Sequence, residues 1–157
     1  MIVPLLDRTL RPLLRWLSRS PDGLHGLLCR GGIAGVFWRS GQTKVHAADG
    51  FGWAINSSTF DLFREEYRVP LIPPDLAAVM ATVSEHLFSA LLVIGLASRL
   101  SAAALLGMTL VIEVFVYPES WPDHLIWASA LVYIIARGPG GLSLDALIRR
   151  ALLPERG

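Results

Sequence analysis

The chain has 157 residues, of which 53% are hydrophobic and only 17% are charged, which is the composition of an integral membrane protein rather than of a soluble enzyme. A net charge of +1 provides no overall attraction to nucleic acid, which we exclude as a partner. The single cysteine, Cys29, excludes an internal disulfide, a CxxC redox pair and a multi-cysteine metal site.

The first twenty residues predict a basic amphipathic helix on the membrane surface, because leucines recur at helical spacing among four arginines. The arginines interrupt the apolar core that a secretory signal needs, so we expect this segment to be retained. Ser20, Pro21 and Asp22 then provide the residue types of a helix start.

The first of four predicted spans covers about residues 24–45, roughly the length that a bilayer requires. It is the least apolar of the four, because polar and charged side chains interrupt it. Gly31 and Gly35 form a small-xxx-small pair that favours the close approach of a neighbouring helix. We therefore place this span inside a bundle.

A polar connection follows over residues 46–74, with a short surface helix within it, and prolines end it. The other spans are predicted at about 75–97, 100–116 and 122–137, the middle two forming a tight helical hairpin. Ser143 can cap a last amphipathic helix on the membrane surface.

The sequence thus predicts one domain over residues 1–157, an all-α integral membrane four-helix bundle with flanking amphipathic surface helices. Nine arginines lie in the N-terminal segment, the turn between the second and third spans and the C-terminal tail, against two in the opposite loops. Positively charged segments beside membrane spans stay on the cytoplasmic side, so both termini are expected in the cytoplasm. The membrane is expected to be the plasma (inner) membrane.

Six ionisable residues fall in the outer half of the predicted spans, and we expect them to line one outward-facing polar pocket. The alternative is that they form structural salt bridges, with Glu85 paired to Arg39 or Lys44 and Glu113 as a further partner. The six residues are Arg39, Lys44, Glu85, His86, Glu113 and His124.

Three ligands fit such a pocket. A quinone head group could bond to the histidines while Glu85 or Glu113 relays a proton. His86 and His124 could ligate a haem iron or, with Glu113 and His46, a copper or zinc ion, although histidines near helix ends are more often simply hydrogen-bonded. The candidate cofactor-binding residues are Arg39, Lys44, Glu85, His86, His124 and Trp127.

Aromatic residues near the outer boundary are typical of an interfacial belt, with a quinone-stacking site as the alternative for the same side chains. They are Trp53, Tyr117, Trp121 and Trp127. The usual catalytic motifs are absent, and the RGPGG run is a turn between helices rather than a nucleotide-binding loop.

Three stretches, in chain order, resemble the DoxX family of small four-helix membrane proteins: CRGGIAGVFWRSGQTKV, PLIPPDLAAVMATVSEHLFSALLVIGLASRLSAAAL and RGPGGLSLDAL. The resemblance covers nearly all of residues 27–150. The matching positions are Arg30, Gly35, Phe37, Ser40, Gly41 and Lys44 in the first stretch, Glu85, Gly95, Leu96, Arg99, Leu100 and Ala102 in the second, and Gly138 to Asp145 in the third.

The resemblance implies an accessory subunit of a membrane redox system, such as a quinone-reducing thiosulfate oxidase or an oxidative-stress complex with a superoxide dismutase. The segment VFVYPESWPDHLIW is similar to DoxX-like members encoded beside bufferin-type metal-binding peptides, which implies a role in copper stress. No redox centre is evident, so we expect an accessory protein with lipids and a protein partner or second copy as its contacts. A small-molecule or metal-ion transporter and a non-catalytic anchor or assembly partner stay open.

The topology can be tested by labelling cysteines in intact cells with a membrane-impermeant thiol reagent. Ser57→Cys should be labelled from outside and Ser18→Cys should not, because the arginine asymmetry places the first in an outer loop and the second in the cytoplasm. The reverse pattern would contradict the predicted orientation.

Overall fold

The computed structural model describes residues 22–48, 52–67 and 69–152, most of which are helical. The predicted surface helix over residues 1–20 lies outside them. The elements are α2 (Asp22–Gln42), β1 (Val45–Ala48), β2 (Gly52–Ile55), α3 (Ser57–Glu65), α4 (Pro74–Ile94), α5 (Ser98–Phe115), the 3-10 helix η1 (Pro118–Ser120), α6 (Trp121–Arg137) and α7 (Leu144–Leu152).

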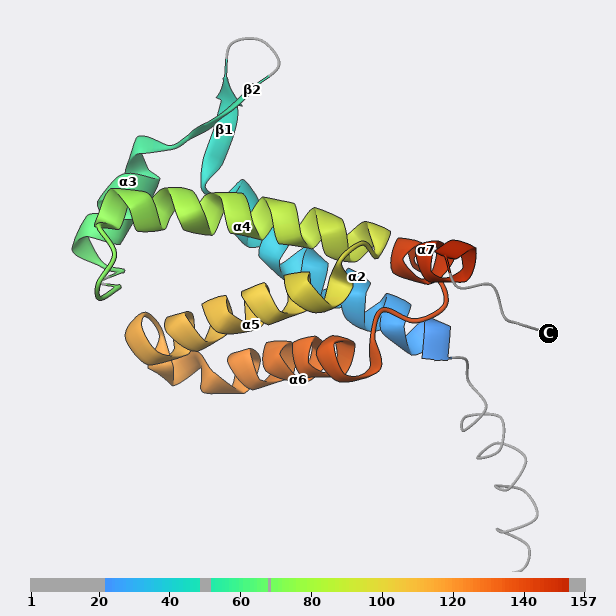
Figure 1. Ribbon diagram of the computed structural model, residues 1–157. Helices are drawn as coiled ribbons and strands as arrows, with labels where there is room; N and C mark the ends of the chain where they lie inside the picture. Colours follow the sequence, from blue (N-terminus) through green and yellow to red (C-terminus); the bar gives the residue numbers. More distant parts are fainter. Residues whose placement is uncertain (1–21, 49–51, 68, 153–157) are drawn as a thin grey trace, which may run out of the picture.

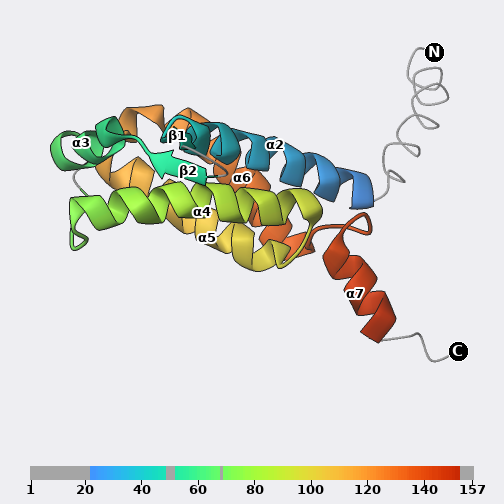
Figure 2. The same cartoon turned by 90° about the horizontal axis from the view of Figure 1, so that it is seen from above.

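Helices α2, α4, α5 and α6 enclose one core, with α2 and α5 each packed against both α4 and α6 (Figure 1). The hairpin and α3 lie at one end of these helices and α7 at the other, as the second view also shows (Figure 2). The core side chains recur at helical spacing on each helix. Its buried members are Ile33, Ala34, Phe37, Leu92, Ala102, Leu105, Leu131 and Ile134.

The outward faces of these helices are apolar as well. Val83, Leu110 and Ile126 are among the large apolar side chains exposed on α4, α5 and α6. Extended apolar surface of this kind marks contact with a membrane or another protein. Two helices in the described part of the chain, α4 and α5, are long and apolar enough to cross a membrane.

The predicted fold class needs one correction, because the chain is not entirely helical. Helix α2 ends at Gln42, short of the predicted 45, and the chain enters an antiparallel hairpin in which Val45 faces Ile55. The two strands have four residues each, too few for an alternating pattern to stand out in the sequence. The other three long helices begin and end within three residues of the predicted spans.

The predicted packing role of Gly31 and Gly35 is wrong. Both are exposed, and a Cβ added at either would meet nothing within 4 Å. Close approach occurs instead at Gly26 and Gly41. A Cβ at Gly26 would lie 2.5 Å from a carbonyl oxygen of the loop after α6, and a Cβ at Gly41 would lie 2.7 Å from the His86 ring. The reason is helical phase, since these two glycines lie on the inward face of α2.

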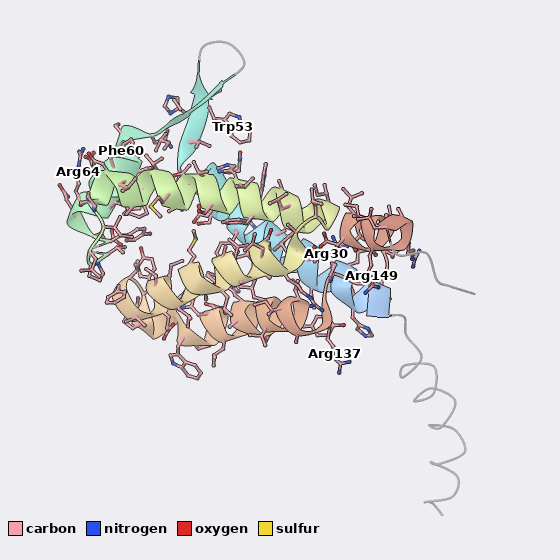
Figure 3. All side chains as sticks on the ribbon, viewed as in Figure 1. Arg30, Trp53, Phe60, Arg64, Arg137 and Arg149 are labelled. Carbon is pink, nitrogen blue, oxygen red and sulfur yellow. The ribbon has the colours of Figure 1, made fainter. Side chains whose placement is uncertain are left out.

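Arg30 holds the end of the bundle that faces α7, and its side chain is fully buried (Figure 3). Its guanidinium donates to the carbonyl oxygens of Leu92 (2.7 Å) and Val93 (3.0 Å) in the last turn of α4. It also donates to those of Pro139 (3.1 Å) and Leu142 (2.5 Å) in the loop after α6. Carbonyls in a last helical turn lack partners and carry the negative end of the helix dipole, so they stabilise the buried cation.

The turn between α4 and α5 is fixed by its own glycine and by the first turn of α7. Gly95, with φ of 73°, ends α4 in the left-handed conformation that glycine adopts most readily. The Asp145 carboxylate then accepts the backbone N–H groups of Ala97 (2.8 Å) and Ser98 (2.9 Å), which start α5. Ser143 caps α7 through an N–H of its first turn at 3.2 Å, as predicted.

Replacing Arg30 with glutamine should lower the free energy of unfolding in detergent by about 3 to 5 kcal/mol, because four buried carbonyls lose a charged donor. The matched control is Arg39→Gln on the same helix, where the side chain is exposed and no change is expected. Equal melting temperatures for the two variants would contradict the role given to Arg30.

Candidate functional site

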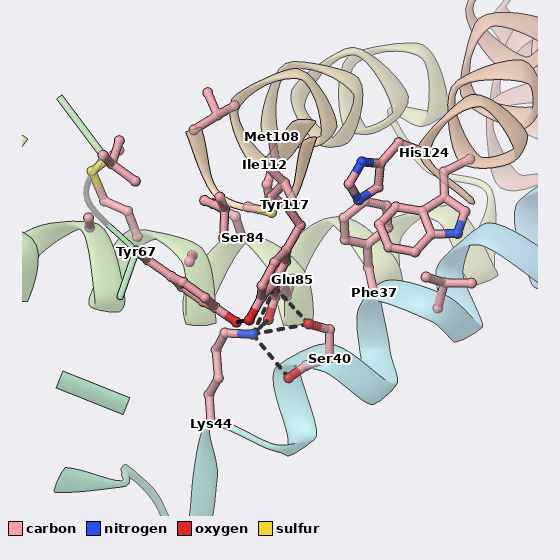
Figure 4. Close-up of a pocket in the computed structure, with 18 of the residues that line it drawn as sticks. Phe37, Ser40, Lys44, Tyr67, Ser84, Glu85, Met108, Ile112, Tyr117 and His124 are labelled. Atoms are coloured by element: carbon pink, nitrogen blue, oxygen red, sulfur yellow. Dashed lines mark hydrogen bonds and ion pairs between the residues drawn. The ribbon is translucent and has the colours of Figure 1, made fainter. Parts of the chain in front are cut away.

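A cavity of about 450 Å³ lies between α2, α4, α5 and α6 at the end of the bundle that carries α3 (Figure 4). Its volume is in the range of small-molecule sites, and most of its walls are apolar, with Phe37, Phe88 and Met108 among them. Four of the predicted site residues line it: Lys44, Glu85, His124 and Trp127.

The predicted ion pair of Glu85 is confirmed, with Lys44 as its cation. The Lys44 Nζ lies 3.0 Å from Oε1 and 2.9 Å from Oε2 of Glu85, and both residues are buried. The Ser40 hydroxyl donates to Oε1 at 3.1 Å and accepts from Lys44 at 3.0 Å. Arg39, the other predicted partner, is exposed on α2 and does not line the cavity.

One carboxylate oxygen of Glu85 accepts no aligned hydrogen bond. Its Oε2 is buried and near Lys44, but among the described residues no donor is aligned to hydrogen-bond to it. Buried carboxylate oxygens normally accept hydrogen bonds, and leaving one without a donor carries a free-energy cost. The ion pair therefore balances the two buried charges in the wall of the cavity.

His124 connects the cavity with the part-exposed Glu113. The imidazole lines the cavity, and its Nδ1 lies 2.5 Å from Oε2 of Glu113, which does not line the cavity. The Trp127 ring packs edge-on against both His124 and Phe37, at centroid distances of 4.9 and 5.7 Å. These contacts fix the imidazole between the cavity and a carboxylate nearer the surface.

Two tyrosines from distant parts of the chain line the cavity beside the ion pair. The hydroxyls of Tyr67 and Tyr117 are 3.0 Å apart, and Tyr117 donates to Glu66 at 2.7 Å. The bond with Tyr67 and then that with Glu66 raise the pKa of Tyr117, so its hydroxyl stays protonated. Neither tyrosine is predicted as a site residue, because Tyr117 fits the aromatic belt and Tyr67 follows a surface helix.

His86 does not share the cavity with the other predicted residues. Its ring contacts Trp38 and Trp53, at centroid distances of 5.2 and 4.9 Å. Its Nδ1 lies 2.7 Å from the carbonyl oxygen of Thr82, and its Nε2 lies 2.9 Å from the Gln42 amide nitrogen. Both ring nitrogens are therefore engaged outside the cavity, and the structure does not pair His86 with His124 as axial haem ligands.

The predicted copper or zinc ligands are likewise not brought together. His46 is exposed on β1 and bonds to Asn56 at 2.6 Å, while Glu113 and His124 lie at the cavity and His86 packs on the other side of α4. Within the described ranges, no three His, Cys, Asp or Glu side chains are grouped so that they could hold a metal ion.

The fold and the site define a helical membrane protein whose helices enclose a largely apolar cavity with an ion pair in its wall. The chain belongs to the DoxX family, a membrane-associated family whose model matches residues 25–118. An uncharacterized protein of Haemophilus influenzae is 30% identical over 142 residues, which cover 82% of this chain and 86% of that protein. No solved structure matches the chain.

Replacing Glu85 with glutamine should lower the free energy of unfolding in detergent by about 1 to 3 kcal/mol, because the buried Lys44 ammonium loses its counter-charge. The double variant Lys44→Met with Glu85→Gln removes both charges and should recover part of the loss. A Glu85→Gln protein that melts like the parent would show that the pair is hydrated or absent.

Proposed function

We propose that this protein crosses the plasma (inner) membrane four times with both termini in the cytoplasm, and that its outward-facing cavity binds a quinone head group. In this proposal it serves a membrane redox system as an accessory subunit. The observation that supports the proposal most is the buried Lys44–Glu85 ion pair, placed in the wall of an otherwise apolar cavity. The family resemblance points to the same class of ligand.

The residues present fit the chemistry of a quinone. The hydroxyl groups of its reduced form can donate to the Glu85 carboxylate, and the carbonyl groups of its oxidised form can accept from the Ser84 hydroxyl. Ser84 lines the cavity, and in the described part of the chain its side chain has no hydrogen bond. The apolar walls suit an isoprenoid tail. When bound, a quinone supplies two-electron, two-proton carrier chemistry.

His124 and Glu113 provide a proton route in this proposal. The Nδ1 of His124 is engaged with Glu113, while its Nε2 has no partner among the described residues. An imidazole that takes up a proton at Nε2 can release the Nδ1 proton to the carboxylate, which is nearer the surface. Copper stress, the narrower role implied by the outer segment, stays a prediction that this cavity does not support.

The proposal is tested by titrating the purified protein in detergent with a short-chain benzoquinol, kept reduced, and following tryptophan fluorescence, since Trp127 lines the cavity. Saturable quenching is expected for the parent. Glu85→Gln and His124→Ala should each weaken binding by about tenfold or more, because each removes a hydrogen bond that involves a charged or polarised group.

The matched control is His86→Ala, which removes a buried histidine outside the cavity and should leave the quinol affinity unchanged. All measurements are made well below the melting temperature of the least stable variant. Absence of saturable quenching in the parent, or an equal loss in the two histidine variants, would overturn quinone binding in this cavity and favour a membrane anchor.

A further inference from the structure

A second cavity, of about 620 Å³, lies at the end of the bundle opposite the first and is lined by arginines from three helices. Arg99 belongs to the first turn of α5, Arg137 to the last turn of α6 and Arg149 to α7. Figure 3 shows Arg137 and Arg149 near Arg30 at this end, far from Arg64. The loop 138–141 forms much of the wall between them.

The charge of these arginines is not neutralised inside the protein. In the part of the chain that the structure describes, none of the three forms a salt bridge. Among the described residues, Asp145 is the single acidic residue that lines the cavity, and its two oxygens already accept the N–H groups of Ala97 and Ser98. The cavity therefore carries an excess of positive charge, which attracts an anion.

The backbone gives this cavity a defined shape. Gly138 has φ of 85°, and a Cβ added there would lie 3.4 Å from Nη2 of Arg99, so the guanidinium packs directly on the loop. From the interior, Arg30 bonds to the carbonyl oxygens of Pro139 and Leu142 in the same loop region. The arginines are thus arranged around a fixed loop rather than scattered over a surface.

The surroundings of the cavity are apolar and lie at the end of a candidate membrane span. Leu100, which lines it, is 68% exposed in the first turn of α5, and Leu147 and Ile148 are exposed on α7. A short helix with exposed leucine and isoleucine beside arginines is typical of the membrane interface. Lipid phosphates lie at the level where a span ends, and acyl chains run along its exposed apolar side chains.

We propose that this cavity binds the phosphate group of an anionic phospholipid, held by Arg99, Arg137 and Arg149, with the acyl chains along Leu100 and the outward face of α5. Basic pockets at helix ends on the cytoplasmic side of a membrane have this ligand preference. The site is separate from the quinone cavity, but it rests on the proposed orientation, which places this end of the bundle on the cytoplasmic side.

The test is native mass spectrometry of the full chain in detergent, titrated with phosphatidylglycerol and, separately, with zwitterionic phosphatidylcholine. The parent should bind phosphatidylglycerol more tightly. Arg149→Gln should reduce its affinity by about fivefold and Arg137→Gln with Arg149→Gln by about 25-fold, because each basic residue near the surface contributes about that factor to anionic-lipid binding. The affinity for phosphatidylcholine should not change.

The sharpest control is Arg150→Gln, which removes the same charge from the next position of α7, where the exposed side chain does not line the cavity. Arg150→Gln should retain the parent's preference for phosphatidylglycerol over phosphatidylcholine. An equal loss in Arg150→Gln and Arg149→Gln would show diffuse surface attraction and overturn the site. Inorganic phosphate that binds as tightly as phosphatidylglycerol would overturn it too, because the acyl chains would then contribute nothing.

Discussion

A buried arginine that is matched by backbone carbonyls, and by no carboxylate, organises this protein. Arg30 extends from α2 to the last turn of α4 and to the loop after α6, so one side chain joins three segments that are far apart in sequence. From the first turn of α7, Asp145 caps the start of α5, which brings in the fourth helix. Burying a guanidinium costs several kcal/mol, and aligned hydrogen bonds to the negative end of a helix offset that cost. All three guanidinium nitrogens of Arg30 donate to carbonyl oxygens, which holds these segments together.

The opposite end holds the first cavity and a buried ion pair. There the buried charges of Lys44 and Glu85 neutralise each other, yet one carboxylate oxygen has no hydrogen bond and the neighbouring space is not filled by side chains. The Tyr67 and Tyr117 hydroxyl pair, which joins the outer segment after α3 to the end of α5, borders that cavity.

Composition and helical periodicity were sufficient to predict the four long helices and the Lys44–Glu85 pair, since a buried carboxylate needs a cation at similar depth. They could not predict the role of Arg30, because its partners are carbonyl groups that every residue carries. They also predicted how deep each residue lies in the membrane, but not toward which side of the helix its side chain points. Successive residues of a helix point about 100° apart, so Glu85 faces the cavity while His86, next in sequence, packs against Trp38. A site assembled from equal depths alone therefore included side chains from the wrong faces.

The Lys44–Glu85 pair is the feature that packing does not explain. Replacing a buried ion pair with apolar residues of similar volume is often neutral or stabilises the protein by about 1 to 4 kcal/mol. A bundle selected only for stability would thus gain by filling this position with leucine or methionine, as it does at Leu92 and Leu105 in the core. The hydrogen bonds of Arg30 are different, because its partners are backbone carbonyl groups, which are present whatever the side chains are. Packing alone therefore does not account for the pair, and the proposed ligand site gives it a role, because Lys44 and Glu85 both line the cavity.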